Sequence, residues 1–307
     1  MDQLRLNILG CGSATPSLRH MPSCQVLEHR RRLFMIDCGE GAQLQMMRMH
    51  LKMNRLNDIF ISHLHGDHFL GLPGLLSTMA LHEKGHAVTV HTFERGAELL
   101  KSMLDFIIGD TPFDLRFNII DPTRRQTLID DKSLTVTSFP LYHRVPAVGF
   151  IFAEKPKLRH IDGEMARFHG VPPYEMESIR RGADFVKPDG EVIPNAMLTT
   201  DASPSASYAY CTDTMFDRRV VASVRGVDTI FHDCTYGDES AHLAAPRGHS
   251  TARQAAEIAR RAGAKRLILG HFSKRYGAEE ELDLARQAAE EFSGEIILAN
   301  EGQKLDL

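Results

Sequence analysis

The sequence predicts an α/β protein built from layered sheets. Three observations favour this class: short apolar runs alternate with turn-forming residues, helical periodicity appears between the runs, and the composition is that of an ordinary globular protein. The chain has 307 residues, of which 43% are hydrophobic and 25% are charged. This composition excludes disordered, collagen-like and low-complexity proteins. The length is sufficient to bury a large core without disulfide bonds.

In the first third of the chain, three apolar runs predict strands over residues 4–9, 33–37 and 58–62. The third run has the continuous apolar character of a strand buried on both faces. Glycine-containing turns follow the first two runs, and a helical stretch after the second turn extends through Met47. Further strands are predicted over residues 87–92, 134–139, 147–152, 207–211, 229–232, 266–269 and 295–298.

The clearest predicted helix covers residues 251–262. Its apolar residues recur at the i, i+3, i+4 and i+7 spacing of one buried helix face. Either Ser250 or Thr251 can cap its first turn, and Gly263 stands at its end. The alternation of strands with such helices predicts an α/β fold with layered sheets.

Charge and cysteine usage indicate which partners and which cellular compartment to expect. The chain has 36 Lys and Arg against 40 Asp and Glu, a formal charge of −4, so a nucleic-acid or membrane partner would need a local basic patch. Five cysteines without a Cys-x-x-Cys pair predict reduced thiols in a cytoplasmic protein. No apolar run approaches 18 residues, so we expect no membrane partner, and the N-terminus has no apolar run typical of a signal peptide.

The sharpest chemical signal follows the predicted strand at residues 58–62. Four potential metal ligands stand close together there: His63, His65, Asp67 and His68. Imidazole and carboxylate are ligands that zinc accepts. Gly66 permits a tight turn, so that His63 and His65 can bind one ion, and the acid and the last histidine can bind a neighbouring ion. The pattern therefore predicts a two-metal site.

Three more candidate ligands end apolar runs in the same way: His143, Asp213 and His271. The segments between them leave room for a helix and a return strand, so all three can converge on one sheet edge. Asp213 is the natural bridge, because a carboxylate has two oxygens and can bind two ions. We expect zinc from these ligand types, with manganese as the alternative.

His249 directly precedes the predicted helix at residues 251–262. A helix N-terminus offers free N–H groups and partial positive charge, which suit a phosphate anion. A histidine at this position can also donate a proton to a leaving oxygen. Because the helix end favours neutral imidazole, a protonated His249 requires a nearby phosphate or carboxylate.

Residues 154–195 differ from the rest of the chain. They are polar, rich in lysine and arginine, and contain five prolines. We expect a single domain over residues 1–307 with an inserted arm at residues 154–195. A solvated surface loop is the alternative interpretation of this segment.

The ligand motifs resemble those of the metallo-β-lactamase superfamily, whose fold is an αβ/βα sandwich of two mixed sheets flanked by helices. Three further segments are similar to the ribonuclease Z family of tRNA 3′-processing endonucleases. They are residues 9–16, the His249-Ser250-Thr251 motif and residues 267–276. The resemblance extends over nearly the whole chain.

This resemblance implies two zinc ions, one held by His63, His65 and His143 and the other by Asp67, His68 and His271, with Asp213 as the bridge. It assigns Asp67 as the proton acceptor for the attacking water and His249 as a helper at the scissile phosphate. The implied activity is cleavage of precursor tRNA by metal-activated water, which leaves a 3′-OH on the tRNA and a 5′-phosphate on the trailer. The family also implies a homodimer in which residues 154–195 hold the tRNA as an exosite.

Two segments depart from the family pattern. Residues 171–174 lack the Gly-Pro pair that is usual in the arm, and Arg19-His20 stands where the family more often has Arg-Asn. The missing pair and the charge of −4 favour a rival activity, hydrolysis of a small phosphodiester or another small ester on the same fold. A non-catalytic RNA-binding module is disfavoured, because a structural zinc site is closed by four ligands and needs no bridging carboxylate.

Overall fold

The computed structural model describes residues 3–82 and 87–307. The chain divides into two compact units. The larger unit, here called the body, consists of Met1–Asp130, Thr135–Ala153 and Ala206–Leu307. The smaller unit, here called the arm unit, consists of Asp131–Leu134 and Glu154–Ser205.

The first sheet of the body has seven strands in the described residues, in the order β18-β1-β2-β3-β4-β5-β6. Strands β3 to β6 run parallel to one another, whereas β1 pairs antiparallel with both β18 and β2. The sheet is therefore mixed. Its strands are β1 (Arg5–Gly10), β2 (Cys24–His29), β3 (Arg32–Ile36), β4 (Leu56–Phe60), β5 (Val88–Thr92), β6 (Leu115–Ile119) and β18 (Lys304–Asp306).

The second sheet also has seven strands among the described residues, in the order β17-β16-β15-β14-β9-β8-β7. Strands β14 to β17 are parallel, and β9 pairs antiparallel with β14. The strands are β7 (Gln126–Asp130), β8 (Leu134–Leu141), β9 (Ala147–Glu154), β14 (Ser207–Cys211), β15 (Thr229–Asp233), β16 (Arg266–Gly270) and β17 (Glu295–Leu298).

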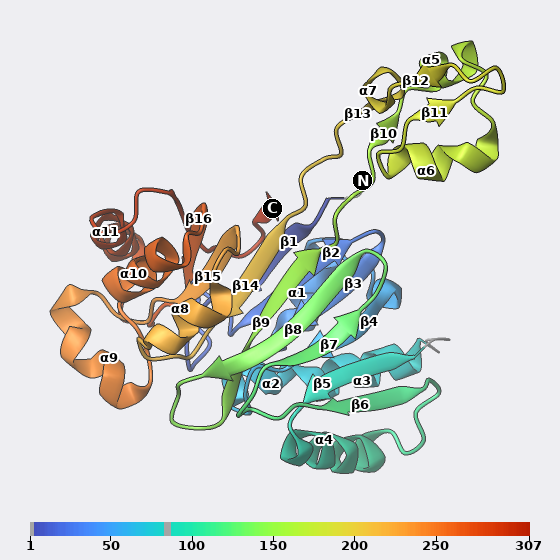
Figure 1. The fold of residues 1–307 in the computed structure, drawn as a ribbon. Helices are drawn as coiled ribbons and strands as arrows, with labels where there is room; N and C mark the ends of the chain where they lie inside the picture. The colour runs from blue at the N-terminus through green and yellow to red at the C-terminus, as the bar shows by residue number, and fades with distance from the viewer. Residues whose placement is uncertain (1–2, 83–86) are drawn as a thin grey trace. The chain divides into compact units, whose positions relative to one another are not determined.

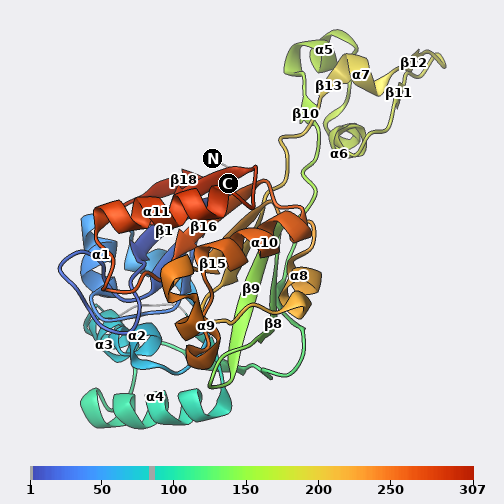
Figure 2. The same cartoon turned by 90° about the vertical axis from the view of Figure 1, so that its left-hand side faces the viewer.

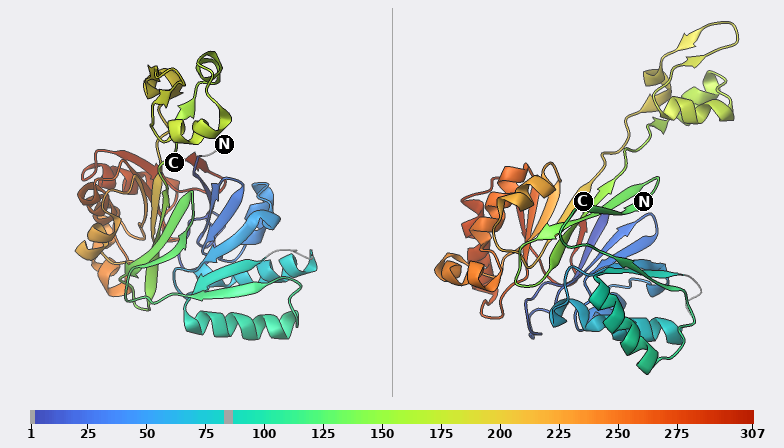
Figure 3. Two further views of the ribbon diagram at one scale, coloured as in Figure 1. Left: turned by 45° about the vertical axis from the view of Figure 1, so that its right-hand side comes forward. Right: turned by 60° about the horizontal axis from the view of Figure 1, so that its bottom comes forward.

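The two sheets pack face to face, and helices cover their outer sides (Figures 1 and 2). Between the sheets, the ring of Phe60 lies 5.4 Å from that of Phe150 and 5.3 Å from that of Phe152. Figure 3 shows the same order of helix, sheet, sheet and helix from two further directions. The body is thus the αβ/βα sandwich that the resemblance predicts.

The helices of the body form two sets. The set on the first sheet is α1 (Ala42–Arg48), α3 (Gly71–Leu81) and α4 (Glu94–Ile107), whose apolar side chains share one core with that sheet. The set on the second sheet is α8 (Arg218–Val224), α10 (Ala252–Ala262) and α11 (Ala278–Ala289). Two short helices, α2 (Gly66–Phe69) and α9 (Ala241–Arg247), lie in loops after strands.

The predicted elements correspond closely to the observed ones. Each of the predicted runs is a strand, most with ends shifted by a residue or two, and the clearest predicted helix is α10. Thr251 caps this helix through a capping box with Gln254, and Gly263 ends it at φ 76°. Among the strands of the body, β2, β6, β7 and β18 were not predicted from the sequence. Polar residues and incomplete burial in β6 and β7 weaken their apolar signal, and pairing with neighbouring strands decides their conformation.

The arm unit has its own small core. Its elements are β10 (His160–Ile161), α5 (Gly163–Phe168), α6 (Met176–Arg180), β11 (Phe185–Val186), β12 (Val192–Ile193), α7 (Asn195–Leu198) and β13 (Thr199–Thr200). β10 pairs with β13 and β11 pairs with β12, each antiparallel. The core consists of Ala166, Val171, Ile179, Phe185, Ile193 and Leu198. The unit extends past residue 195, as far as Ser205.

All five cysteines are buried and unpaired, as the sequence predicts. Burial raises the pKa of the Cys24 and Cys211 thiols, so these side chains are protonated and behave as small apolar groups. Over the described residues, no helix combines the length and the apolar character that a membrane span requires.

Candidate metal centre

The predicted ligands meet at one edge of the body, in loops that follow strands. His63, His65, Asp67 and His68 follow β4; His143 follows β8, Asp213 follows β14 and His271 follows β16. The turn at Gly66 is the start of α2, so Asp67 lies on a short helix rather than on an extended segment. This helix start separates the histidines at 63 and 65 from the ligands at 67 and 68.

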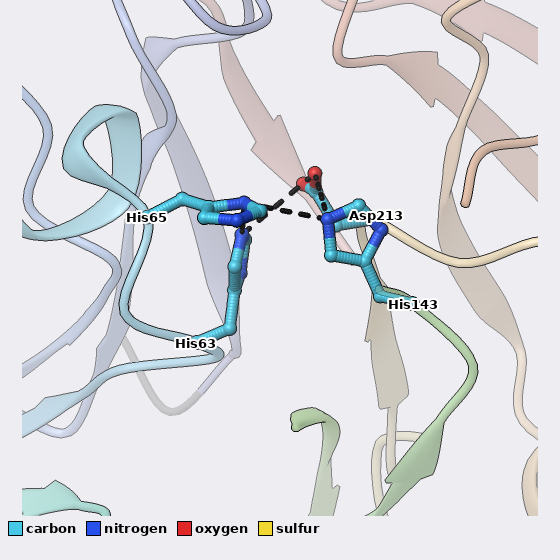
Figure 4. A group of neighbouring side chains, drawn as sticks. All are labelled: His63, His65, His143 and Asp213. Atoms are coloured by element: carbon cyan, nitrogen blue, oxygen red, sulfur yellow. Dashed lines mark hydrogen bonds and ion pairs between the residues drawn. The ribbon is translucent and has the colours of Figure 1, made fainter. Parts of the chain in front are cut away.

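One group of donors consists of three imidazoles and a carboxylate: His63, His65, His143 and Asp213 (Figure 4). Nδ1 of His65 lies 3.0 Å from Nε2 of His63 and 3.3 Å from Nε2 of His143. Both of those Nε2 atoms lie 3.8 Å from Oδ1 of Asp213. These four atoms therefore surround a space of the size of one metal ion.

A second group consists of Asp67, His68 and His271. Nε2 of His68 lies 3.4 Å from Oδ2 of Asp67, and Nε2 of His271 lies 3.6 Å from the same oxygen. The other oxygen of Asp213, Oδ2, lies 3.0 Å from Nε2 of His68 and 3.1 Å from Nε2 of His271. Asp213 thus presents one carboxylate oxygen to each group, which is the geometry of a bridging ligand.

Partners outside the two groups fix the orientation of the imidazoles. Nδ1 of His68 bonds with Asp37 Oδ2 at 2.7 Å, Nδ1 of His143 bonds with the carbonyl of Gly248 at 2.8 Å, and Nδ1 of His271 bonds with the hydroxyl of Thr235 at 2.9 Å. In each case Nε2 is the nitrogen that faces the group. Such outer partners hold ligand histidines in one tautomer and one ring orientation.

The protonation states of the donors fit a bound cation. Burial lowers the pKa of His63 and of His143, so their imidazoles are neutral and have a lone pair to donate. Although burial opposes ionisation, neighbouring histidines hold the pKa of Asp67 and of Asp213 well below the usual range of a carboxyl. Burial opposes a charge on His68, but Asp213, Asp37 and Asp67 raise its pKa well above the ordinary value, so this ring is protonated without an ion. A divalent ion would take the place of that proton, because a metal ion requires ionised carboxylates and neutral imidazoles as ligands.

Two buried nitrogens also indicate that the centre binds a cation. Nε2 of His68 and Nε2 of His271 have no hydrogen-bond partner among the described residues, although carboxylate oxygens lie near both. A buried polar atom without a partner carries a free-energy cost unless another group binds it. A divalent ion would bind both nitrogens and balance the charge of the two acids.

The backbone is strained at this edge. Asp213 and His271 adopt positive φ angles of 50° and 62°, and Asp37 adopts 57°. Non-glycine residues rarely occupy this region, which is often found at functional sites where the surroundings hold the chain in place. The left-handed residues come one or two positions after strand ends, where the chain turns at the centre.

His249 lies beside both groups. Its ring centroid is 5.2 Å from that of His143 and 5.3 Å from that of His271. Its Nδ1 bonds with Oδ2 of the buried Asp233 at 2.8 Å. Burial opposes a charge on this ring, but Asp233 raises the pKa of His249 above its ordinary value. Asp233 is therefore the carboxylate that a protonated His249 requires.

Sequence reasoning missed three residues that support the centre: Asp37, Asp233 and Thr235. Asp37 accepts hydrogen bonds from the Ser62 amide at 2.7 Å and from the Tyr210 hydroxyl at 2.9 Å, in addition to its bond with His68. Asp37 and Asp233 both stand at strand ends, which is the signal that identified Asp213. The contact of Asp233 with His249 makes it part of the centre.

Comparison with protein families supports the fold at both ends of the chain. A sequence model described as "Anti-Pycsar protein Apyc1" matches residues 4–154. A second, described as "Beta-lactamase superfamily domain", matches residues 196–272. The second match includes Asp213 and His271.

Curated relatives align with the chain over its full length. It is 47% identical to a ribonuclease Z of Parabacteroides distasonis, over 100% of both chains. It is 44% identical to a ribonuclease Z of Porphyromonas gingivalis (strain ATCC BAA-308 / W83), again over 100% of both chains.

Solved structures agree with this relationship. The short form of human tRNase Z superposes with a TM-score of 0.70 at 25% identity, over 98% of each chain. The metallo-β-lactamase-fold protein YhfI of Bacillus subtilis superposes with a TM-score of 0.70 at 16% identity over 100% of each chain, which supports the fold alone. The fold is thus that of the metallo-β-lactamases, and the fold implies the use of a divalent metal. With these full-length relatives and this architecture, the chain belongs to the ribonuclease Z family of metallo-β-lactamase-fold endonucleases.

Proposed function

We propose that this protein is an endoribonuclease that removes the 3′ trailer from precursor tRNA. The observation that carries the proposal is the position of Asp213, whose two oxygens face two separate groups of ligands. Two metal positions bridged by one carboxylate are suited to in-line displacement at a phosphodiester. The full-length similarity to enzymes named ribonuclease Z supplies the substrate class.

We further propose that the centre holds two zinc ions, with manganese as the alternative. One ion would be held by His63, His65 and His143, and the other by Asp67, His68 and His271, with Asp213 shared. The mixture of imidazole and carboxylate ligands favours zinc. When bound, the ions activate water at neutral pH and stabilise negative charge on the phosphate oxygens.

Asp67 is proposed to accept the proton of the attacking water. Its Oδ2 receives a hydrogen bond of 2.7 Å from the backbone amide of Ala14, which fixes the direction of this carboxylate. The low pKa of Asp67, to which His68 and His271 contribute against the effect of burial, keeps it ionised before attack. The water oxygen forms a bond with phosphorus as the proton leaves.

His249 is proposed to donate a proton to the leaving oxygen. Its Nδ1 is bound by Asp233, so Nε2 is the nitrogen that would carry the transferred proton. The bond between phosphorus and the 3′ oxygen breaks as this oxygen takes the proton. The tRNA then ends in a 3′-OH and the trailer begins with a 5′-phosphate.

Residues 154–195 are proposed to bind the tRNA. The side chains of Phe168 and Tyr174 are 80% and 81% exposed, and aromatic rings of this kind can stack on bases. Arg167 makes no ion pair among the described residues, so its charge is available to a phosphate. The family resemblance also implies a homodimer, which sedimentation would report as twice the 34.4 kDa chain mass. The five unpaired cysteines favour a cytoplasmic location.

The proposal is tested with a 3′-extended precursor tRNA beside bis-p-nitrophenyl phosphate. We expect the protein to cleave the precursor at the 3′ end of the tRNA, to leave a 3′-OH, and to bind RNA with an affinity that falls steeply with salt. Turnover of the small diester without cleavage of the precursor would replace the proposal with the small-ester alternative. Capture of the precursor without cleavage of either compound would favour an RNA-binding module.

A further inference from the structure

A second buried cluster lies outside the metal centre, around His20. Nε2 of His20 bonds with Oε1 of Glu281 at 2.9 Å, and Nδ1 bonds with Oε2 of Glu301 at 3.0 Å. The side chain of His20 is 6% exposed and that of Glu281 is 4% exposed. One imidazole thus connects α11 with the segment that follows β17.

Other groups of the loop at residues 11–22 bind the same two acids. Arg19 donates to Glu281 from Nε at 2.9 Å and from its terminal nitrogen at 2.6 Å. The backbone amides of Met21 and Cys11 donate to Oε1 of Glu301 at 2.8 and 3.3 Å. Both ends of the loop are therefore fastened to carboxylates from other parts of the body.

The middle of this loop touches the metal centre. The Ala14 amide donates to Asp67, as described above. The Ser13 amide donates to the carbonyl of Phe272 at 3.0 Å, and the Phe272 amide donates to the carbonyl of Cys11 at 2.9 Å. Phe272 directly follows His271. The loop therefore contacts one ligand and the neighbour of a second.

The loop also has little room to move. A Cβ atom at Gly12 would lie 2.8 Å from Cβ of His20, and one at Gly10 would meet the carbonyl oxygen of Pro22 at 1.8 Å. Contacts this close mean that the two sides of the loop pack directly on each other. A shift of His20 would therefore be transmitted to residues 11–14.

We propose that His20 is a positioning residue for the phosphodiesterase reaction: as an imidazolium between Glu281 and Glu301, it holds the loop whose Ala14 amide orients Asp67. This inference rests on the proposed function for its effect on catalysis. The connection from His20 through the loop to the Ala14 amide and Asp67 can be measured without substrate.

The surroundings of His20 favour its charged form. Burial opposes the charge, but the hydrogen bonds with Glu281 and Glu301 together raise the pKa of His20 to about 9. The other ionisable groups at the cluster are the Arg19 guanidinium and the Cys11 thiol. A cavity of about 290 Å³, lined in part by His20 and Lys274, gives solvent access for proton exchange.

The same residues form a weak candidate for a metal site. Ligand atoms of Cys11, His20 and Glu301 lie within 4.8 Å of one another. However, both nitrogens of His20 already face carboxylates, and burial together with Glu301 raises the pKa of the Cys11 thiol. A protonated thiol and an imidazole bound on both sides have no free donor for an ion.

The test follows the Ala14 amide and the His20 ring by NMR across pH 6–10, in zinc-loaded wild type, Glu301→Gln and His20→Ala. Asp283→Asn is the matched control, because it removes a carboxylate of the same helix α11 that pairs with the exposed Arg286 and lies outside the His20 cluster. Zinc content and circular dichroism are measured on each variant. kcat and KM are measured over the same pH range.

We expect the His20 ring and the Ala14 amide of the wild type to titrate together near pH 9, and at lower pH in Glu301→Gln. In Glu301→Gln, kcat should fall about tenfold at pH 8 and less at pH 6, with KM nearly unchanged; His20→Ala should lose roughly 10- to 100-fold at every pH. The control should match the wild type.

An Ala14 amide that is unchanged in His20→Ala would overturn the proposal. An equal fall of kcat at all pH values in Glu301→Gln, or a loss of zinc in parallel with activity, would overturn it as well. If the wild type cleaves neither precursor tRNA nor the small diester, the proposed function fails. The NMR titration of Ala14 would still decide whether His20 holds the loop.

Discussion

Two buried clusters of imidazoles and carboxylates border the loop at residues 11–22, and they are built differently. In the metal centre, Nε2 of His68 and of His271 lack hydrogen-bond partners among the described residues, although carboxylate oxygens face them. In the other cluster, each nitrogen of His20 is bound by a carboxylate of its own, Glu281 or Glu301.

The difference teaches how to distinguish a metal site from an ion-pair network when both contain the same residue types. Donors that converge on one space without partners need a cation from outside the chain. Donors that already bind one another supply their own charge balance. The metal centre therefore needs a cation for its charge balance, whereas the His20 cluster needs a proton.

The largest effect is expected from Asp213→Ala. This substitution removes the only oxygens in the seven-ligand set that face both groups, so the variant should lose bound metal. Activity should fall by at least about 10⁴-fold, because bound ions contribute several kcal/mol to the transition state and each 1.36 kcal/mol is tenfold in rate.

Elemental analysis of Asp213→Ala and His20→Ala, purified side by side, checks this expectation. It also tests whether metal is bound at the metal centre and not at the His20 cluster. The first should lose zinc and the second should retain it. Full zinc content in Asp213→Ala would contradict the bridging role, and loss of zinc from His20→Ala would mean that the loop is needed to retain metal and not only to orient Asp67.

His249→Ala should retain metal and lose roughly 10²- to 10⁴-fold in rate, the usual contribution of one positioned proton donor. His249 resembles His20 in that a buried or half-buried carboxylate, here that of Asp233, bonds with its Nδ1. Asp233→Asn keeps this hydrogen bond but removes the charge, so its loss should be smaller. Single-turnover rates with precursor tRNA give the comparison; wild-type rates in His249→Ala would remove its role as donor.

A smaller effect is expected from the arm unit, which lies outside both clusters. The double variant Arg167→Ala/Arg180→Ala should raise KM for precursor tRNA roughly tenfold and reduce the salt dependence of binding, as the loss of phosphate contacts predicts. Turnover of bis-p-nitrophenyl phosphate should be unchanged. Arg124→Ala, which removes an exposed arginine paired with Asp121 in the body, is the control. Equal KM values in the two variants would argue against RNA binding by residues 154–195.

The smallest effect concerns stability. The pKa of His20 is about 9 in the folded chain and near its ordinary value of 6.5 when unfolded. Its charge therefore stabilises the fold fully below pH 6.5, and this contribution is lost as pH rises through 9. Wild type should melt roughly 2–4 °C above His20→Gln at pH 6, with a smaller difference at pH 10. A difference that is the same at every pH would contradict the charged state.

Local patterns were sufficient to predict much of the fold. The run at residues 207–211 is a strand with the predicted ends, because a strand in the middle of a covered sheet needs apolar side chains on both faces. The run at residues 295–298 also has the predicted ends, although it is a half-buried strand at the edge of its sheet. β2 was missed because Gln25 and His29 interrupt its apolar pattern, although both are buried. Their burial depends on partners in other segments, which local sequence does not reveal.

The meeting of the candidate ligands was predictable because chemistry and position coincide in the sequence: each candidate follows an apolar run. The supporting residues were harder to predict. Asp37 and Asp233 also end strands, but their roles depend on which imidazole they meet in space. The role of His20 could not be predicted from residue spacing, because its partners Glu281 and Glu301 lie more than 250 residues away along the chain.

The most direct test of the two-metal centre is an anomalous-difference map at the zinc edge, from crystals of the protein as purified. We predict two peaks on either side of the Asp213 carboxylate, one among His63, His65 and His143 and the other among Asp67, His68 and His271. An empty centre, or a single peak at Cys11, His20 and Glu301, would contradict the account.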